Sequence, residues 1–172
     1  MGEPALRLVE PESVSTQAFL DVMRGVAASV TIVTTDGPGG RYGTTVSSFT
    51  SVSVAPPTVL VCLAHHSRIA AAVRANGRFA VNVLSSAMQE IAQRFAGRDD
   101  AAVADRFDGV ERQAVESGLP ILAGATGLVC RLDDLTTVAT HDVCFGQVEA
   151  VHGGGQAPLA YLDRSFCRVE RL

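Results

Sequence analysis

The alternation of apolar, β-branched and polar residues along the chain predicts a series of short strands. About seven segments have this pattern, and turn residues such as Gly, Pro and Asp separate them. They cover residues 29–35, 41–54, 58–63, 78–84, 128–139, 143–152 and 159–168. Regular alternation of strands and helices is absent, so this order disfavours a parallel doubly wound sheet.

Helical spacing of apolar residues predicts three short helices, at residues 16–26, 69–76 and 86–96. Ser86 and Gln89 fit a capping box at the start of the third helix. Strands that follow one another through tight turns favour an antiparallel arrangement. We therefore expect a mainly β fold, an antiparallel Greek-key-like barrel with a few short flanking helices.

The length of 172 residues, with 47% hydrophobic and 19% charged residues, suits one globular domain. We expect a flexible arm at residues 1–14, a single domain over residues 15–172, and an irregular segment at 98–127. The four cysteines form no C-x-x-C pair and lie mostly in apolar runs. This pattern predicts free thiols and no metal site.

The formal net charge is −4, and all fourteen basic residues are arginines that are spread along the chain. A nucleic-acid surface usually needs a concentrated positive patch, so the distribution argues against a nucleic-acid partner. The N-terminal residues lack the features of a signal peptide, and no apolar stretch approaches the roughly 20 residues of a membrane span. We expect a soluble, cytoplasmic protein without a membrane partner.

The most unusual stretch covers residues 44–53, where seven of ten residues carry hydroxyls although apolar strands flank them. The adjacent pairs Thr44-Thr45 and Ser47-Ser48 place polar groups on both faces of a strand. A solvated edge strand is one interpretation. The other is a flat ligand with hydrogen-bonding edges and an apolar body, such as a flavin ring.

Residues 65–68 follow a predicted strand and open a predicted helix. Ser67 and Arg68, together with the free N–H groups of the helix N-terminus, suit an anion site. An ordinary N-cap beside a solvated arginine explains the same residues equally well. His65 and His66 are neighbours on an extended chain and point opposite ways, so they are not expected to share a metal ion.

Other features carry little chemistry by themselves. His141 lies, with Asp142, at the predicted tip between two long strands, where a lone histidine is most often a surface residue. Gly37 and Gly39 occupy a turn with no helix after it, which excludes a Rossmann fingerprint. No Ser-His-Asp or paired-carboxylate arrangement has a defensible spacing.

In order along the chain, several segments resemble the flavin reductase-like family, the small reductases that serve two-component flavin monooxygenases. The likeness covers about residues 16–170. It is carried by Val22-Met23-Arg24, Gly43 to Ser53, Pro56 to Leu63, Ser67-Arg68, Arg78 to Leu84 and Ala92 to Gly97. Each segment is a weak signal alone, and their combination in this order is specific.

The resemblance implies an FMN-binding split β-barrel that forms a homodimer, with flavin near the subunit contact. It implies an NAD(P)H:flavin oxidoreductase that transfers hydride from NADH or NADPH to FAD or FMN. Reduced flavin would then reach a partner monooxygenase by diffusion. The site residues that it implies are Thr45, Val46, Ser47 and Ser48 at the ring and ribityl chain, Cys62, Leu63, Ala64, Ser67 and Arg68 at the ribityl chain and phosphates, Asn82, Arg94 and Phe95 near the same pocket, and His141 at the nicotinamide.

The chain also departs from the family pattern. The family often has Gly-Asp before the histidine, where this chain has Ala139-Thr140, which affects the expected nicotinamide contacts. The family usually has Gly at the position of Ser29. It often has Thr at the position of Ile69, so one possible phosphate hydroxyl is missing.

Hydride transfer between two cofactors needs no protein nucleophile, which agrees with a sequence that lacks a catalytic constellation. Three alternatives stay open. The chain could hold a prosthetic flavin that acts on its own substrate, or serve as a non-catalytic flavin or haem-binding module. It could also be a structural dimer with a vestigial pocket, and the hydroxyl-rich stretch with Ser67-Arg68 counts against that.

Overall fold

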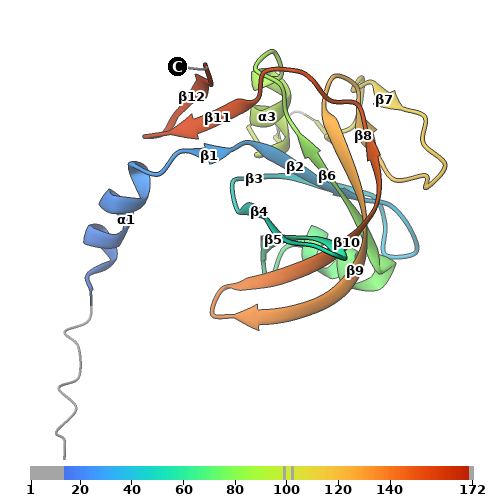
Figure 1. Ribbon diagram of the computed structural model, residues 1–172, viewed down its shortest axis with the longest axis horizontal. Helices are drawn as coiled ribbons and strands as arrows, with labels where there is room; N and C mark the ends of the chain where they lie inside the picture. Colours follow the sequence, from blue (N-terminus) through green and yellow to red (C-terminus); the bar gives the residue numbers. More distant parts are fainter. Residues whose placement is uncertain (1–13, 99, 102, 171–172) are drawn as a thin grey trace, which may run out of the picture.

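The computed structural model describes residues 14–98, 100–101 and 103–170, and strands dominate this part of the chain (Figure 1). Seven of its strands pair in one antiparallel sheet in the order β3-β2-β6-β9-β10-β5-β4. They are β2 (Thr31–Thr35), β3 (Tyr42–Val46), β4 (Phe49–Val54), β5 (Pro57–Ala64), β6 (Arg78–Val83), β9 (Thr126–Val138) and β10 (His141–His152). The end strands β3 and β4 are separated along the chain only by Ser47 and Ser48, so the sheet curls into a split barrel.

Smaller elements flank the barrel. One three-stranded sheet contains β1 (Ala28–Ser29), β11 (Leu159–Leu162) and β12 (Ser165–Arg168), and a two-stranded sheet contains β7 (Arg112–Gln113) and β8 (Ile121–Leu122). The helices are α1 (Thr16–Arg24), α2 (Arg68–Asn76) and α3 (Gln89–Phe95). In Figure 1, α1 stands away from the barrel at the end of β1. No helix of the described chain is long and apolar enough to cross a membrane.

Apolar residues fill the barrel because their spacing matches the two-residue repeat of a strand. In β5, Val59, Val61 and Leu63 are buried, and the residues between them are more exposed. β6 is buried on both faces. Phe79 packs in the main core, whereas Ala80 packs with a smaller cluster that includes Ile121 of β8.

The expected mainly β architecture, an antiparallel barrel with short flanking helices, is confirmed. Two strand predictions need correction. The segment 41–54 forms two strands, because the chain bends at Ser47-Ser48 and passes from one end of the sheet order to the other. The segment 159–168 is a hairpin, since Asp163 and Arg164 adopt positive φ values of 45° and 62° and reverse the chain.

Three further local predictions were also wrong. The capping box is absent: α3 begins after Met88 without a side-chain cap, and the N–H of Ser86 donates to the carbonyl of Ala157 instead. Asp142 is not part of a tip, because the turn lies at residues 139–140 and Asp142 is fully buried inside β10. The segment 98–127 contains the β7–β8 hairpin. Most of the predicted arm, residues 1–13, lies outside the described residues.

Candidate functional site

A cavity of about 610 Å³ lies between β3, β5 and the first residues of α2 and β10. We call it the central cavity. It is lined by Thr44, Thr45, Val46, Ser47, Ser48, Cys62, Leu63, Ala64, Ser67, Ile69, Val138, His141 and Val143. Segments that are far apart in the sequence therefore meet at one place: the hydroxyl-rich stretch, the end of β5, the start of α2 and the tip of the β9–β10 hairpin.

The hydroxyls of the 44–48 stretch divide into two groups. Ser48 Oγ donates to the Cys62 carbonyl (3.0 Å) and accepts from the Cys62 N–H (3.2 Å), and Thr45 Oγ1 donates to the Ala92 carbonyl (2.7 Å). These two hydroxyls fasten the bend to β5 and to α3. Thr44 and Ser47 make no side-chain hydrogen bond within the described residues, so their hydroxyls are available to a ligand.

The central cavity is uncharged over the described residues, because no Asp, Glu or Arg lines it. Val46, Leu63 and Val143 supply apolar surface, and the hydroxyls supply donors and acceptors at one side. Ligand sites for flat heterocycles combine a mostly apolar wall with a few convergent polar groups. The composition of the wall fits a flavin ring on these grounds.

A second cavity, of about 670 Å³, adjoins the first and shares Thr44, Ser67 and Ile69 with it. We call it the α2 cavity, since the N-terminus of α2 forms part of its wall. Ser67 is the N-cap of this helix, and its Oγ accepts from the N–H of Ala70 (3.2 Å). Arg68 follows, with its guanidinium 5.8 Å from the centre of the Tyr42 ring.

The other two arginines that line the α2 cavity form ion pairs. Arg41 is 2.5 Å from Asp105, and Arg106 is 2.6 Å from Asp100. Arg68 has no carboxylate within ion-pair distance in the described part of the chain. An exposed guanidinium beside a helix N-terminus is suited to a phosphate group.

A buried carboxylate holds one side of the central cavity in place. Asp142 Oδ1 is 2.8 Å from His65 Nδ1 and accepts from Thr137 Oγ1 (2.8 Å), while Oδ2 accepts from Arg74 (2.7 Å). Burial raises the pKa of Asp142, but the hydrogen bonds from His65 and Thr137 and the charge of Arg74 outweigh it, so the pKa is lowered overall. Asp142 thereby ties the β5–α2 loop and α2 to the β9–β10 hairpin.

Sequence reasoning missed Asp142, because a lone acid beside a predicted turn is normally solvated. Its partners are on three other segments, and the pairing of β10 with β9 and with β5 brings Thr137 and His65 to it. His141, the residue before it, lies at the rim of the central cavity. His141 is exposed, and its Nδ1 is 2.9 Å from Thr140 Oγ1. The described residues contain no group of three or more His, Cys, Asp or Glu placed to hold a metal ion.

Three of the residues implied by the resemblance line none of the described cavities. Asn82 is fully buried, and its side chain bonds to Ile32 and Leu122 inside the barrel wall. Phe95 is also fully buried, with its ring edge-on to Phe107 at 5.0 Å. Arg94 is half-buried with no partner for its Nε. The structure does not bring these three side chains to the central cavity, and Asn82 and Phe95 serve packing instead.

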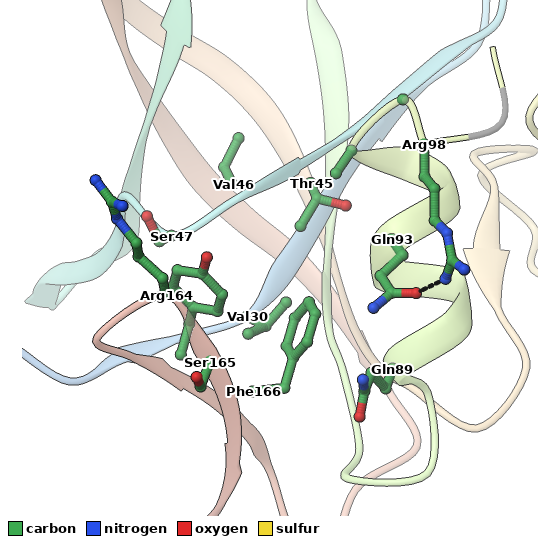
Figure 2. Close-up of a pocket in the computed structure, with 13 residues that line it drawn as sticks. Val30, Thr45, Val46, Ser47, Gln89, Gln93, Arg98, Arg164, Ser165 and Phe166 are labelled. Carbon is green, nitrogen blue, oxygen red and sulfur yellow. Dashed lines mark hydrogen bonds between the residues drawn. The ribbon is translucent and has the colours of Figure 1, made fainter. Parts of the chain in front are cut away.

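A third cavity, of about 900 Å³, opens on the other side of the 45–47 segment (Figure 2). We call it the hairpin cavity, since the β11–β12 hairpin forms one wall and α3 the other. It is lined by Val30, Thr45, Val46, Ser47, Gln89, Gln93, Ala96, Gly97, Arg98, Tyr161, Arg164, Ser165 and Phe166. Sequence reasoning missed the hairpin residues, because it treated 159–168 as one straight strand.

Comparison with known proteins agrees with this geometry. Residues 23–170 match the family described as "Flavin reductase like domain". The chain is 42% identical over 159 residues to the FMN reductase (NADH) RutF 2 of Methylorubrum extorquens (strain PA1), which covers 91% of each chain. It is 41% identical to the FMN reductase (NADH) RutF of Ancylobacter novellus, over 91% of this chain and 87% of that one.

Solved structures give the same result. The NADH:FAD oxidoreductase SgcE6 of Streptomyces globisporus, in complex with NAD and FAD fragments, superimposes with a TM-score of 0.82 at 29% identity, over 92% of this chain and 97% of that one. BorF, the flavin reductase component of a bacterial two-component tryptophan halogenase, superimposes with a TM-score of 0.80 at 27% identity, over 92% and 100%. With its split barrel, its neutral hydroxyl-lined cavity and these matches, the chain belongs to the flavin reductase-like family.

Proposed function

We propose that this chain is an NADH-dependent flavin reductase, which takes hydride from NADH and delivers it to FMN. The observation that carries the proposal is the central cavity, whose uncharged wall joins the 45–48 segment, the end of β5 and His141. Flavin supplies the redox chemistry when it is bound, and the protein supplies contact and orientation. The FMN reductases among the relatives support FMN as the acceptor and NADH as the donor.

In this proposal the hydroxyl-rich bend holds the flavin ring. Thr44 and Ser47 offer free hydroxyls, and Ser48 and Thr45 keep the bend in place through their own hydrogen bonds. Hydroxyl and N–H donors of this bend would stabilise the negative charge of a reduced flavin. The flavin phosphate would be held by Ser67 and Arg68, where an N-cap lies beside a guanidinium that forms no ion pair with the described residues.

His141 positions the nicotinamide at the rim of the central cavity. Ala139 and Thr140, which precede it, depart from the usual family residues, so the test addresses the histidine itself. His141→Ala should raise KM for NADH by more than it raises KM for FMN, and a measurement of both under steady-state conditions checks this. Unchanged KM and kcat with NADH would remove His141 from the site.

A homodimer completes the proposal. The helix α1 has no buried residue, and Phe19, Leu20 and Met23 are exposed on it. An amphipathic helix that buries none of its residues against the described part of its own chain is suited to a second copy. Light scattering should give the mass of a dimer, and Phe19→Glu should shift it toward a monomer while Gln17→Ala does not.

Reduced flavin leaves for a separate monooxygenase, by diffusion, in the cytoplasm. Support comes from the names of two structural neighbours, a nitrilotriacetate monooxygenase component B and the reductase component of a two-component halogenase. All four cysteines are free in the structure, as is usual in a reducing compartment.

Anaerobic turnover tests the central claim. The purified protein is mixed with NADH and a molar excess of free FMN, and the visible absorbance of the flavin is followed. Loss of absorbance from the whole pool supports the reductase. Loss from one equivalent only would indicate a prosthetic flavin with its own substrate, and no loss would indicate a non-catalytic binder. The same assay with FAD and with NADPH ranks the four cofactor pairs.

A further inference from the structure

Two neighbouring histidines follow β5, and their contacts differ. His65 is half-buried, and its Nδ1 is 2.8 Å from Oδ1 of the fully buried Asp142. His66 is exposed and forms no hydrogen bond or ion pair with the described residues, although its ring centre lies 4.7 Å from that of His65. The contacts proposed above for flavin and nicotinamide use neither histidine.

The end of the β9–β10 hairpin is weakly packed. We call residues 136–141 the β9–β10 tip, and Figure 1 shows it at the end of two long paired strands. Every residue of the tip is exposed, so burial contributes little to its position. Its turn includes Ala139 at a φ of 49°, a value that residues with side chains seldom adopt. His141, the proposed nicotinamide contact, belongs to this tip.

His65 bonds to the hairpin on both sides of His141. Its backbone N–H donates to the carbonyl of Thr140 (3.0 Å), and its side chain meets the carboxylate of Asp142. Asp142 is the first buried residue after the tip. A residue whose two neighbours are both fixed has less conformational freedom to lose when a ligand binds. The His65–Asp142 hydrogen bond therefore lowers the cost of a contact made by His141.

The start of α2, on the other side of the same loop, is held without His65. Ser67 caps the helix through its own hydroxyl, which accepts from the N–H of Ala70 (3.2 Å). Ile69 and Val73 are buried in the main core. Loss of the His65 side chain should therefore free the β9–β10 tip and leave the phosphate end of the flavin site in place.

We propose that His65 is a positioning residue for the hydride donor, which acts through Asp142 to hold His141 against the nicotinamide. This rests on the proposed function, in which His141 makes that contact. A neutral imidazole with its hydrogen on Nδ1 is sufficient, because it donates to the carboxylate without carrying a charge. His65 lines none of the described cavities, so its effect passes through the tip.

The test uses three substitutions at the two histidines. His65→Leu removes the donor to Asp142, and His65→Asn offers an amide N–H close to the place of Nδ1. His66→Leu is the matched control, since it changes the neighbouring, exposed histidine in the same way. Thr137 and Arg74 still donate to Asp142 in each variant, and thermal melting reports whether the fold is retained.

Steady-state kinetics separate the two cofactors. His65→Leu should raise KM for NADH roughly fivefold to tenfold, as expected for the loss of one hydrogen bond to a charged group. It should change KM for FMN by less than about twofold, because α2 keeps its own contacts. His65→Asn should recover most of the loss, and His66→Leu should match the wild type.

A double-mutant cycle tests whether His65 acts through His141. In a His141→Ala background, His65→Leu should raise KM for NADH by less than about twofold further, because the contact that it positions is already gone. Hydrogen–deuterium exchange measures the tip without turnover. The backbone N–H groups of residues 136–141 should exchange faster in His65→Leu than in the wild type, whereas those of α2 should not.

Two outcomes overturn the proposal while the reductase function stands. In one, the wild type reduces FMN and His65→Leu has the same KM for NADH as His66→Leu. In the other, His65→Leu raises KM for NADH equally with and without His141. A wild type that reduces no flavin overturns the proposed function, and the exchange measurement still decides whether His65 holds the tip.

Discussion

The two sides of the 45–48 bend are held by very different contacts. On one side, the buried Asp142 joins His65, Thr137 and Arg74, which lie on three separate segments. On the other side, the β11–β12 hairpin pairs with the two-residue strand β1, and Leu159 at its start exchanges backbone hydrogen bonds with Val30 and Leu84. Its turn is fastened to α1 by one backbone hydrogen bond, from Asp163 to the Arg24 carbonyl (3.0 Å).

The difference indicates how firmly each wall is held before a ligand binds. A wall fixed by a buried carboxylate is formed before the ligand arrives, so binding needs little further ordering. The hairpin wall is anchored through the buried Leu159 and Ala160, whereas its turn at Asp163 and Arg164 is exposed, so this turn moves at lower cost than the wall held by Asp142. Four predictions test this contrast, from the largest expected effect to the smallest.

Asp142→Asn should lower the free energy of unfolding by about 2 kcal/mol, because the neutral amide cannot replace a carboxylate with three donors. The melting temperature should fall by several degrees, which calorimetry measures. Asp133→Asn is the control. Asp133 forms an exposed pair with Arg131 (3.1 Å), and its loss should cost no more than about 0.5 kcal/mol. Equal effects from the two substitutions would contradict the role of Asp142.

The contribution of Asp142 should depend on pH in one direction. Its pKa in the folded chain lies below the ordinary 3.8, so the stabilisation is present above the unfolded value and is lost as the pH falls through the folded value. The melting-temperature difference between wild type and Asp142→Asn should be full at about pH 5 and should shrink toward about pH 3. A difference that stays constant over this interval would show that the charge of Asp142 contributes nothing.

Ser48→Ala should lower the free energy of unfolding by about 1 kcal/mol, because it removes both side-chain hydrogen bonds between the bend and Cys62. It should also raise KM for FMN, since the bend forms a wall of the central cavity. Ser165→Ala, in the hairpin wall, is the comparison. Its hydroxyl has no partner in the described residues, so the change should stay within about 0.5 kcal/mol. Denaturant titration measures the free energy of unfolding of both variants. A loss from Ser165→Ala as large as that from Ser48→Ala would contradict the difference between the two walls.

Cysteine alkylation should show which side of the 45–48 bend is covered by FMN, and it does so without a change in the stability of the protein. Burial raises the pKa of Cys130 and of Cys144 to about 12, so neither should react in the native protein near neutral pH. Cys62 lines the central cavity and Cys167 lies on β12, and both are half-buried. FMN should slow alkylation of Cys62 and leave Cys167 unchanged, as peptide mass spectrometry would measure. Protection of Cys167 instead would place FMN on the hairpin side.

Some of the site could be predicted from local sequence because it depends on local chemistry. The hydroxyls of residues 44–48, the N-cap at Ser67 and the guanidinium of Arg68 were expected at a ligand site, and the first two line the central cavity. Asn82 was expected there as well. It is buried instead, because Ile32 and Leu122, distant in sequence, satisfy its amide.

The sequence by itself determined the strand-rich content, the short helices and the family, because two-residue periodicity and ordered motifs are properties of neighbouring residues. Only the tertiary structure decided that the polar stretch bends at Ser47-Ser48, that Asp142 is buried, and that the hairpin turns at Arg164. The burial of Asp142 depends on His65 and Arg74, which are distant in the sequence, and the turn at Arg164 depends on backbone conformation at two residues that the apolar pattern does not reveal.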